Sequence, residues 1–93
     1  MKRKDAIKNA IKISKAVKEL NIEIFKATTS GHKIYLIDRE KEKITAQLIG
    51  WELKTDKSIF YIIKYIENGI VVQKKIRPEE LIKIYKLSIF YQD

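Results

Sequence analysis

Apolar residues near the start of the chain recur with the spacing of an amphipathic helix. Between residues 5 and 20, one arc of the helical projection collects small and apolar side chains: Ala6, Ile7, Ala10, Ile13, Ser14, Val17 and Leu20. Asn21 stands where a C-cap residue is expected. The pattern predicts an N-terminal helix over residues 1–21 that packs through this arc on the rest of the domain.

From residue 22 onward the apolar period changes to two, and turn residues separate the apolar runs. The alternation of Ile22 and Ile24 predicts a short strand over residues 22–26, before a turn cluster at 28–31. Longer strands are predicted over residues 32–38, 44–53, 58–66 and 70–76. Charged or polar turns join these strands, and the last turn contains Asn68-Gly69, a strong hairpin signal. Gly50, inside a strand, predicts a bulge or a sharp bend.

The segment IRPEELIKI (residues 76–84) fits both periods. Pro78 and the two glutamates after it form a favourable helix start. The alternation at the end of the segment is typical of a strand instead. After four strands of a meander, we prefer a tight turn over residues 77–80 and a last strand over 81–87. A helix over residues 78–90 is the alternative.

Together these elements predict an α+β fold in one domain of 93 residues. The N-terminal helix packs on a strongly bent five-stranded antiparallel β-barrel of Sm-like or SH3-like type. The barrel occupies residues 22–87, and residues 88–93 form a C-terminal tail.

Composition adds a basic character to this fold. The chain is 45% hydrophobic and 34% charged, contains no cysteine and carries a net charge of +8, which favours an intracellular globular protein with a polyanionic partner. Residues 1–20 alone hold seven basic and two acidic groups. Lysine also outnumbers arginine, and isoleucine outnumbers leucine, which is typical of an AT-rich genome or a thermophile. Composition is therefore a second explanation of the charge.

Lysines gather on the helical arc opposite the apolar one, and they are the candidate phosphate ligands. The members that we single out are Lys4, Lys8, Lys12 and Lys15. Like charges without interleaved acids repel one another, so this face favours an anionic partner over bare solvent. A second basic group, Lys75 and Arg77, follows the fourth long strand, and the Arg77 guanidinium suits both phosphate binding and base stacking.

Two segments resemble the motifs of the Sm-like family, the Sm, LSm and Hfq-type RNA-binding rings. TAQLIGWE (residues 45–52) is similar to the bent strand of the first motif, and IRPEELIKI to the second, with Pro78 where the family has glycine. The pocket asparagine of the family has no clear match within residues 55–58. The resemblance implies RNA binding and a homo-oligomeric ring, in which the last strand of one subunit pairs with the fourth strand of its neighbour.

Catalytic chemistry is not indicated. The single His32 follows a turn glycine, no cysteine or second histidine accompanies it, and no phosphate-binding glycine loop occurs, so we predict no enzyme, cofactor or metal. Trp51 and Tyr35 are candidates for base stacking, although core packing is the preferred interpretation of Trp51. Tyr61 and Tyr65 share a strand face and are also expected in the core.

The prediction is a cytoplasmic, non-catalytic nucleic-acid-binding protein that prefers RNA to DNA. The alternative is a protein-interaction adaptor or inhibitor, encoded by a host, virus or plasmid, that uses an exposed strand edge. The C-terminal residues Ile89, Phe90 and Tyr91 would form its interface or an oligomer contact, because few core positions should remain for them.

Overall fold

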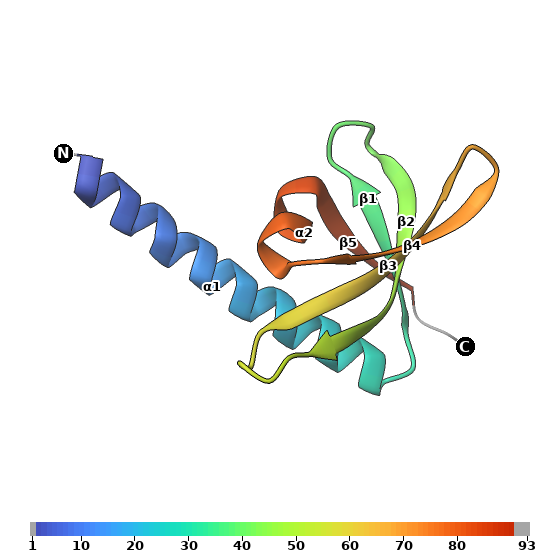
Figure 1. The fold of residues 1–93 in the computed structure, drawn as a ribbon, viewed down its shortest axis with the longest axis horizontal. Helices are drawn as coiled ribbons and strands as arrows, with labels where there is room; N and C mark the ends of the chain where they lie inside the picture. Colours follow the sequence, from blue (N-terminus) through green and yellow to red (C-terminus); the bar gives the residue numbers. More distant parts are fainter. Residues whose placement is uncertain (1, 91–93) are drawn as a thin grey trace.

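The structure is a computed structural model that describes the backbone of residues 2–90 and the side chains of residues 14–89 (Figure 1). A long helix, α1 (Lys2–Thr29), precedes four strands in chain order: β1 (Lys33–Asp38), β2 (Lys43–Leu53), β3 (Ile59–Glu67) and β4 (Ile70–Ile76). A short helix, α2 (Pro78–Ile84), then leads into the last strand, β5 (Tyr85–Phe90).

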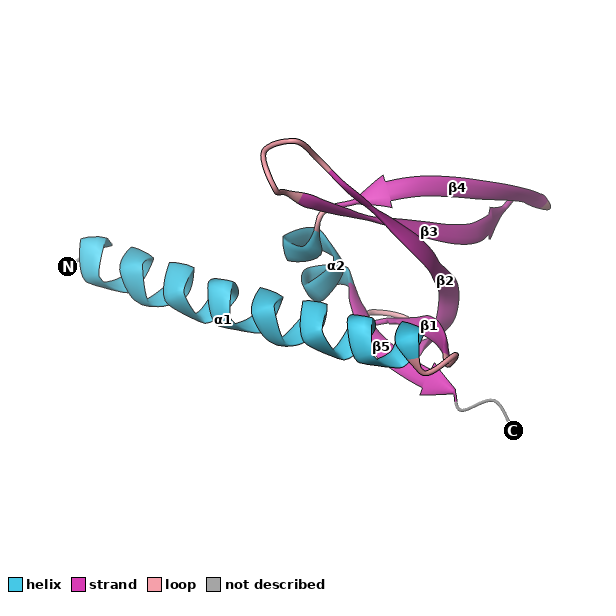
Figure 2. Ribbon diagram, turned by 90° about the horizontal axis from the view of Figure 1, so that it is seen from below, coloured by secondary structure: helices cyan, strands magenta, loops and turns pink. Residues whose placement is uncertain are grey.

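The strands form one antiparallel sheet in the order β4-β3-β2-β1-β5. This confirms the predicted α+β fold with a five-stranded antiparallel sheet. The sheet bends through β2, so that β3 and β4 lie over β1 and β5 with α2 between the two layers (Figure 2). A closed barrel is not formed by the described residues, because β4 and β5 are the two edges of the sheet. Here α2 carries the chain from one edge to the other and occupies the space between them.

The core lies between α1, α2 and the concave face of the sheet. On α1, the buried residues Leu20, Ile24 and Ala27 follow the i, i+4, i+7 spacing of one helix face. This face packs on α2 and β1. The strands and α2 complete the buried cluster with Ile34, Leu36, Ala46, Leu48, Tyr61, Ile63, Ile76 and Leu81.

The predicted end of the first helix at residue 21, and the predicted strand at 22–26, are wrong. The helix continues to Thr29. The isoleucines at 22 and 24 alternate as they would in a strand, but only Ile24 is buried, and Ile22 lies on the exposed side of the helix. Gly31, with φ of 76°, follows the actual end of the helix. There the Gly31 and His32 amides donate to the carbonyls of Thr28 and Ala27, which is a Schellman arrangement.

Replacing Gly31 with alanine is expected to lower the free energy of unfolding by about 1 kcal/mol, because an L-residue is strained at positive φ. No neighbouring atom lies within 4 Å of the added Cβ, so the cost comes from the backbone. Urea denaturation would measure it. Gly50→Ala is the matched control: its φ is not positive, and its new Cβ would lie 4.0 Å from the Ile62 Cδ1 atom, an ordinary contact. An equal loss in both variants would contradict the helix end at Gly31.

The central meander is confirmed to within one residue at each strand end. Asn68 (φ 52°) and Gly69 (φ 77°) form the predicted hairpin turn between β3 and β4. The β2–β3 register shifts between Leu48 and Gly50, which is the predicted bulge. A second shift, in the β1–β2 pairing between Leu36 and Ile37, was not predicted. Bulges increase local twist, and both contribute to the bend of the sheet.

The interpretation of residues 77–87 as a turn and a strand is wrong in part, and so is the helix alternative for 78–90. The chain forms the helix α2 first, with Pro78 in its first turn and Glu79 and Glu80 near its positive end. The strand then begins at Tyr85 and includes residues 88–90 of the predicted tail. Leu81 explains the outcome, because the helical turn places this side chain in the core with no exposed surface.

Candidate functional site

Two basic side chains lie against one phenylalanine on the face of the sheet opposite to the core, and a third contacts the glutamate beside it. The cross-strand register places Phe60 of β3 opposite Glu52 of β2. The Lys54 ammonium lies 5.6 Å, and the Arg77 guanidinium carbon 5.5 Å, from the centre of the Phe60 ring. Lys75 of β4 contributes the third positive charge. We call Lys54, Phe60, Lys75 and Arg77 the Phe60 cluster.

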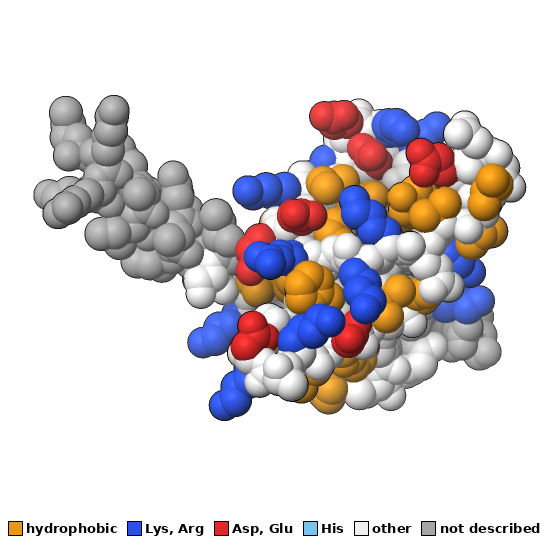
Figure 3. Space-filling model, viewed as in Figure 1, with side chains coloured by type: hydrophobic (Ala, Val, Ile, Leu, Met, Phe, Trp, Pro, Cys, Tyr) orange, Lys and Arg blue, Asp and Glu red, His pale blue; other side chains and the backbone are white. Residues whose placement is uncertain are grey.

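Glu52 holds two of these lysines in place. Its Oε1 atom accepts from the Lys54 ammonium at 3.2 Å, and its Oε2 atom accepts from Lys75 at 2.5 Å. These hydrogen bonds, first that from Lys75, hold the pKa of the Glu52 carboxyl below its usual value. Glu52 and Asp56, whose carboxylate also senses the Arg77 charge, leave these three cations with an excess of one positive charge. On the face of the molecule that Figure 3 draws, basic, acidic and hydrophobic side chains are interspersed.

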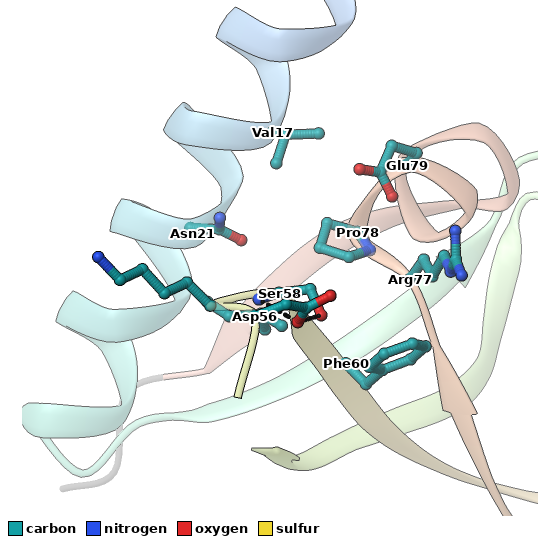
Figure 4. Close-up of a pocket in the computed structure, with 10 residues that line it drawn as sticks. Val17, Asn21, Asp56, Ser58, Phe60, Arg77, Pro78 and Glu79 are labelled. Atoms are coloured by element: carbon teal, nitrogen blue, oxygen red, sulfur yellow. Dashed lines mark hydrogen bonds between the residues drawn. The ribbon is translucent and has the colours of Figure 1, made fainter. Parts of the chain in front are cut away.

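A cleft of about 340 Å³ opens beside the Phe60 cluster, between α1, the β2–β3 turn and the start of α2 (Figure 4). Asn21 lines it from α1, while Arg77 and Pro78 line it from the opposite side. At the turn, Asp56 accepts hydrogen bonds from the Ser58 amide at 3.1 Å and the Ser58 hydroxyl at 2.6 Å. Those bonds from Ser58, and more weakly the charge of Arg77, lower the pKa of the Asp56 carboxyl. The cleft therefore combines fixed anionic and cationic groups.

The structure brings together some of the predicted phosphate ligands. Lys75 and Arg77 meet in the Phe60 cluster, as their closeness in sequence suggested. Lys15 is exposed on α1. The other three helix lysines lie in α1, but their side chains are outside the described residues: Lys4, Lys8 and Lys12. Sequence reasoning missed Lys54 and Phe60, whose only signal was their position on either side of the predicted β2–β3 turn.

The predicted C-terminal interface remains a prediction, although one reason for it does not hold. Ile89 lies in β5 opposite Ile34 and packs against the core, so core positions do remain for this part of the chain. Phe90 ends β5, with its backbone opposite Lys33. Tyr91 lies outside the described residues.

The aromatic residues divide between the core and the surface. Tyr61 is buried and Tyr65 packs against the core, as predicted. Burial raises the pKa of Tyr61 to about 12, and its hydroxyl donates to the Asn21 Oδ1 atom. The core placement of Trp51 is wrong: 40% of its surface is exposed. It lies opposite buried Tyr61 in the β2–β3 register, beside an open pocket between α1 and the sheet.

His32 is half-buried at the turn between α1 and β1. Among the described residues, no three His, Cys, Asp or Glu side chains converge as metal ligands. Neither of the described helices combines the length and apolar content of a bilayer-spanning segment.

Comparison with known proteins adds no relative to this description. No protein-family model matches the chain, and neither the curated proteins nor the solved structures yield a match. The function must therefore be argued from the geometry of the chain itself.

Proposed function

We propose that this protein is a non-catalytic, cytoplasmic nucleic-acid-binding protein that contacts phosphates and prefers RNA to DNA. The observation that carries the proposal is the Phe60 cluster. Lys54 and Arg77 lie against the half-buried Phe60 ring. Lys75 contacts the neighbouring Glu52, and all three cations are exposed. Nucleic-acid-binding surfaces that lack sequence preference combine these two chemistries, cations for the backbone and aromatic rings for the bases.

Arg77 is the central residue of the proposed site. Its guanidinium lies beside the Phe60 ring and at the edge of the cleft, so it can donate to a phosphate while one of its faces remains on the ring. Lys54 and Lys75 share a single carboxylate partner, so they retain donors for phosphate oxygens. Because Glu52 is only half-buried, with 39% of its side chain exposed, a phosphate can compete with it at a modest cost in stability.

The α1 lysines supply a second, longer-range field in this proposal. Lys15 and Lys18 are exposed on the side of α1 turned away from buried Leu20 and Ile24. The three lysines before them continue the same sequence pattern toward the N-terminus, which extends beyond the sheet (Figure 1). The proposed preference for RNA over DNA rests on the Sm-like resemblance, since phosphate contacts alone do not distinguish the two nucleic acids.

Two sets of substitutions test the proposal. The variant K54Q/K75Q/R77Q is expected to bind labelled single-stranded RNA about tenfold more weakly. The slope of its log affinity against log salt concentration should become shallower by about 2, because fewer counterions are released on binding. The variant K4Q/K8Q/K12Q/K15Q is expected to flatten the slope by about 3 for the same reason. Fluorescence anisotropy across a salt series would measure both.

The matched control removes equal charge elsewhere. Lys41, Lys43 and Lys86 are exposed near the β1–β2 turn, at the other end of β2 from the Phe60 cluster. The variant K41Q/K43Q/K86Q should keep most of the affinity. Equal losses in the cluster variant and this control would mean that only net charge matters, and would reject the assigned site.

A second candidate function is association through strand edges, with a further copy of the chain or with another protein. The β3–β4 hairpin supports it, because Ile66, Ile70 and Val71 are 71%, 66% and 61% exposed. The edges β4 and β5 also lie at opposite ends of the sheet, as an Sm-like ring would require. A ring predicts a concentration-independent oligomer by light scattering. An adaptor predicts a monomer whose partner binding is lost when the three exposed hairpin residues are replaced together by serine.

A further inference from the structure

A second, apolar pocket lies on the α1 side of the sheet, adjacent to the cleft. Its volume is about 240 Å³, and α1, β2 and β3 line it with Asn21, Ile24, Phe25, Trp51, Ile59 and Tyr61. Asn21 and Ile59 also line the cleft, so the two hollows are neighbours that share one wall. The packing explains the opening: α1 lies mainly against α2 and β1.

Two aromatic rings at the mouth of this pocket are not part of the buried core. Phe25 is 60% exposed and Trp51 is 40% exposed. Their ring centroids are 6.4 Å apart and their planes are inclined by 48°, so the rings are not stacked on one another. Each ring keeps apolar surface on which a flat ligand can pack. Such stacking tolerates any base, because every base has a π-face.

The wall of the pocket offers polar groups that a base can use. The Tyr61 hydroxyl donates to the Asn21 Oδ1 atom, which fixes the orientation of the amide. Asn21 lines the pocket, and its amide nitrogen carries two further donors that the Tyr61 contact does not use. The exocyclic oxygens and ring nitrogens of a base accept such hydrogen bonds, whereas an aliphatic side chain cannot. The chemistry therefore favours a base over an apolar residue of a protein.

Positive charge flanks the same groove. Lys57 and Arg77 line the adjoining cleft. Lys18 is exposed and precedes Asn21 and Phe25 by three and seven residues, which places all three on one side of α1. A chain that put a base against Phe25 would therefore find these cations on the cleft side of the pocket, where its phosphates can reach them.

We propose that the groove between α1 and the β2–β3 hairpin binds single-stranded nucleic acid, with one unpaired base against Phe25 and Trp51 and its phosphates toward Lys18 and Lys57. This inference rests on the proposed function and names its ligand class. It excludes a duplex as the preferred ligand, because a paired base cannot enter the pocket.

The test uses Trp51 as its own reporter, since it is the only tryptophan in the chain. The full chain is titrated at low salt with short oligouridylate and, separately, with inorganic polyphosphate. Oligouridylate should quench the tryptophan emission, whereas polyphosphate should bind without quenching. Phe25→Leu should weaken oligouridylate binding about tenfold by removing a stacking face. It should leave polyphosphate binding unchanged.

Controls separate the outcomes. Ile66→Ala, which removes an exposed apolar side chain from the distant hairpin, should bind oligouridylate like the parent. Oligouridylate binding by anisotropy without a change in Trp51 emission, or with full affinity in Phe25→Leu, would overturn the pocket and leave the proposed function standing. Absence of binding to either polyanion would overturn both. A shift of Trp51 emission with protein concentration alone would assign the groove to a second copy of the chain and overturn the inference.

Discussion

Replacing Leu81 with alanine is expected to lower the free energy of unfolding by about 3 kcal/mol, a large part of the stability of a domain of this size. Leu81 has no exposed surface. It lies in α2, which contacts α1, β3 and β5 and fills the space between the two edges of the sheet. Truncation removes apolar contacts and leaves a cavity that these elements cannot easily close. Urea denaturation, followed by far-ultraviolet circular dichroism, would measure the loss.

Ile84→Ala is the control on the same helix. Ile84 is 41% exposed, so its truncation should cost less than about 1 kcal/mol. A small loss for Leu81→Ala, similar to that of Ile84→Ala, would contradict the placement of α2 in the core. It would favour the strand interpretation of this segment instead.

The second large effect is a loss of stability at alkaline pH that depends on Tyr61. Burial raises the pKa of its hydroxyl from 10.0 to about 12, whereas the unfolded chain ionises near 10. The contribution of Tyr61 is therefore fully present below pH 10 and is lost as the pH rises toward 12, because the unfolded state releases its proton first. The loss should reach about 2–3 kcal/mol. Denaturant midpoints measured from pH 8 to 12 would follow it.

Tyr61→Phe should remove most of this alkaline loss. At neutral pH it should cost about 1 kcal/mol, because the Asn21 Oδ1 atom loses its donor. A smaller alkaline loss should remain, since burial and the nearby Asp38 carboxylate also raise the pKa of Tyr85. Tyr65→Phe, on the same face of β3, is the control and should keep the alkaline loss of the parent. The same pH profile in Tyr61→Phe and the parent would contradict the burial of this hydroxyl.

The parts of the fold that were predictable from sequence are those with local signals. Asn68-Gly69 and the alternation on either side of it specify the β3–β4 hairpin, and Gly50 marks the bulge in β2. The end of α1 was missed because Ile22 and Ile24 alternate as in a strand. The helical spacing of Leu20, Ile24 and Ala27 has meaning only once the sheet is present to bury them.

Tertiary contacts also explain the other differences between the prediction from sequence and the structure. Local sequence could not choose between helix and strand for α2, because the burial of Leu81 selects the helix. At the candidate site, Lys75 and Arg77 were predictable from their closeness in the chain. Lys54 and Phe60 join them only through the register of β2 with β3, which no local pattern gives. The pairing of Phe25 with Trp51 likewise joins a helix to a strand far along the chain.

The most direct test of nucleic-acid binding is an anisotropy titration of the unmodified chain with labelled single-stranded RNA and with duplex DNA across a salt series. We expect micromolar or tighter binding of the RNA at low salt and weaker binding of the duplex. The affinity for RNA should fall steeply as salt increases, because lysine and arginine contacts release counterions. Absence of binding to either nucleic acid at low salt would contradict the proposed function and would assign the basic charge to composition.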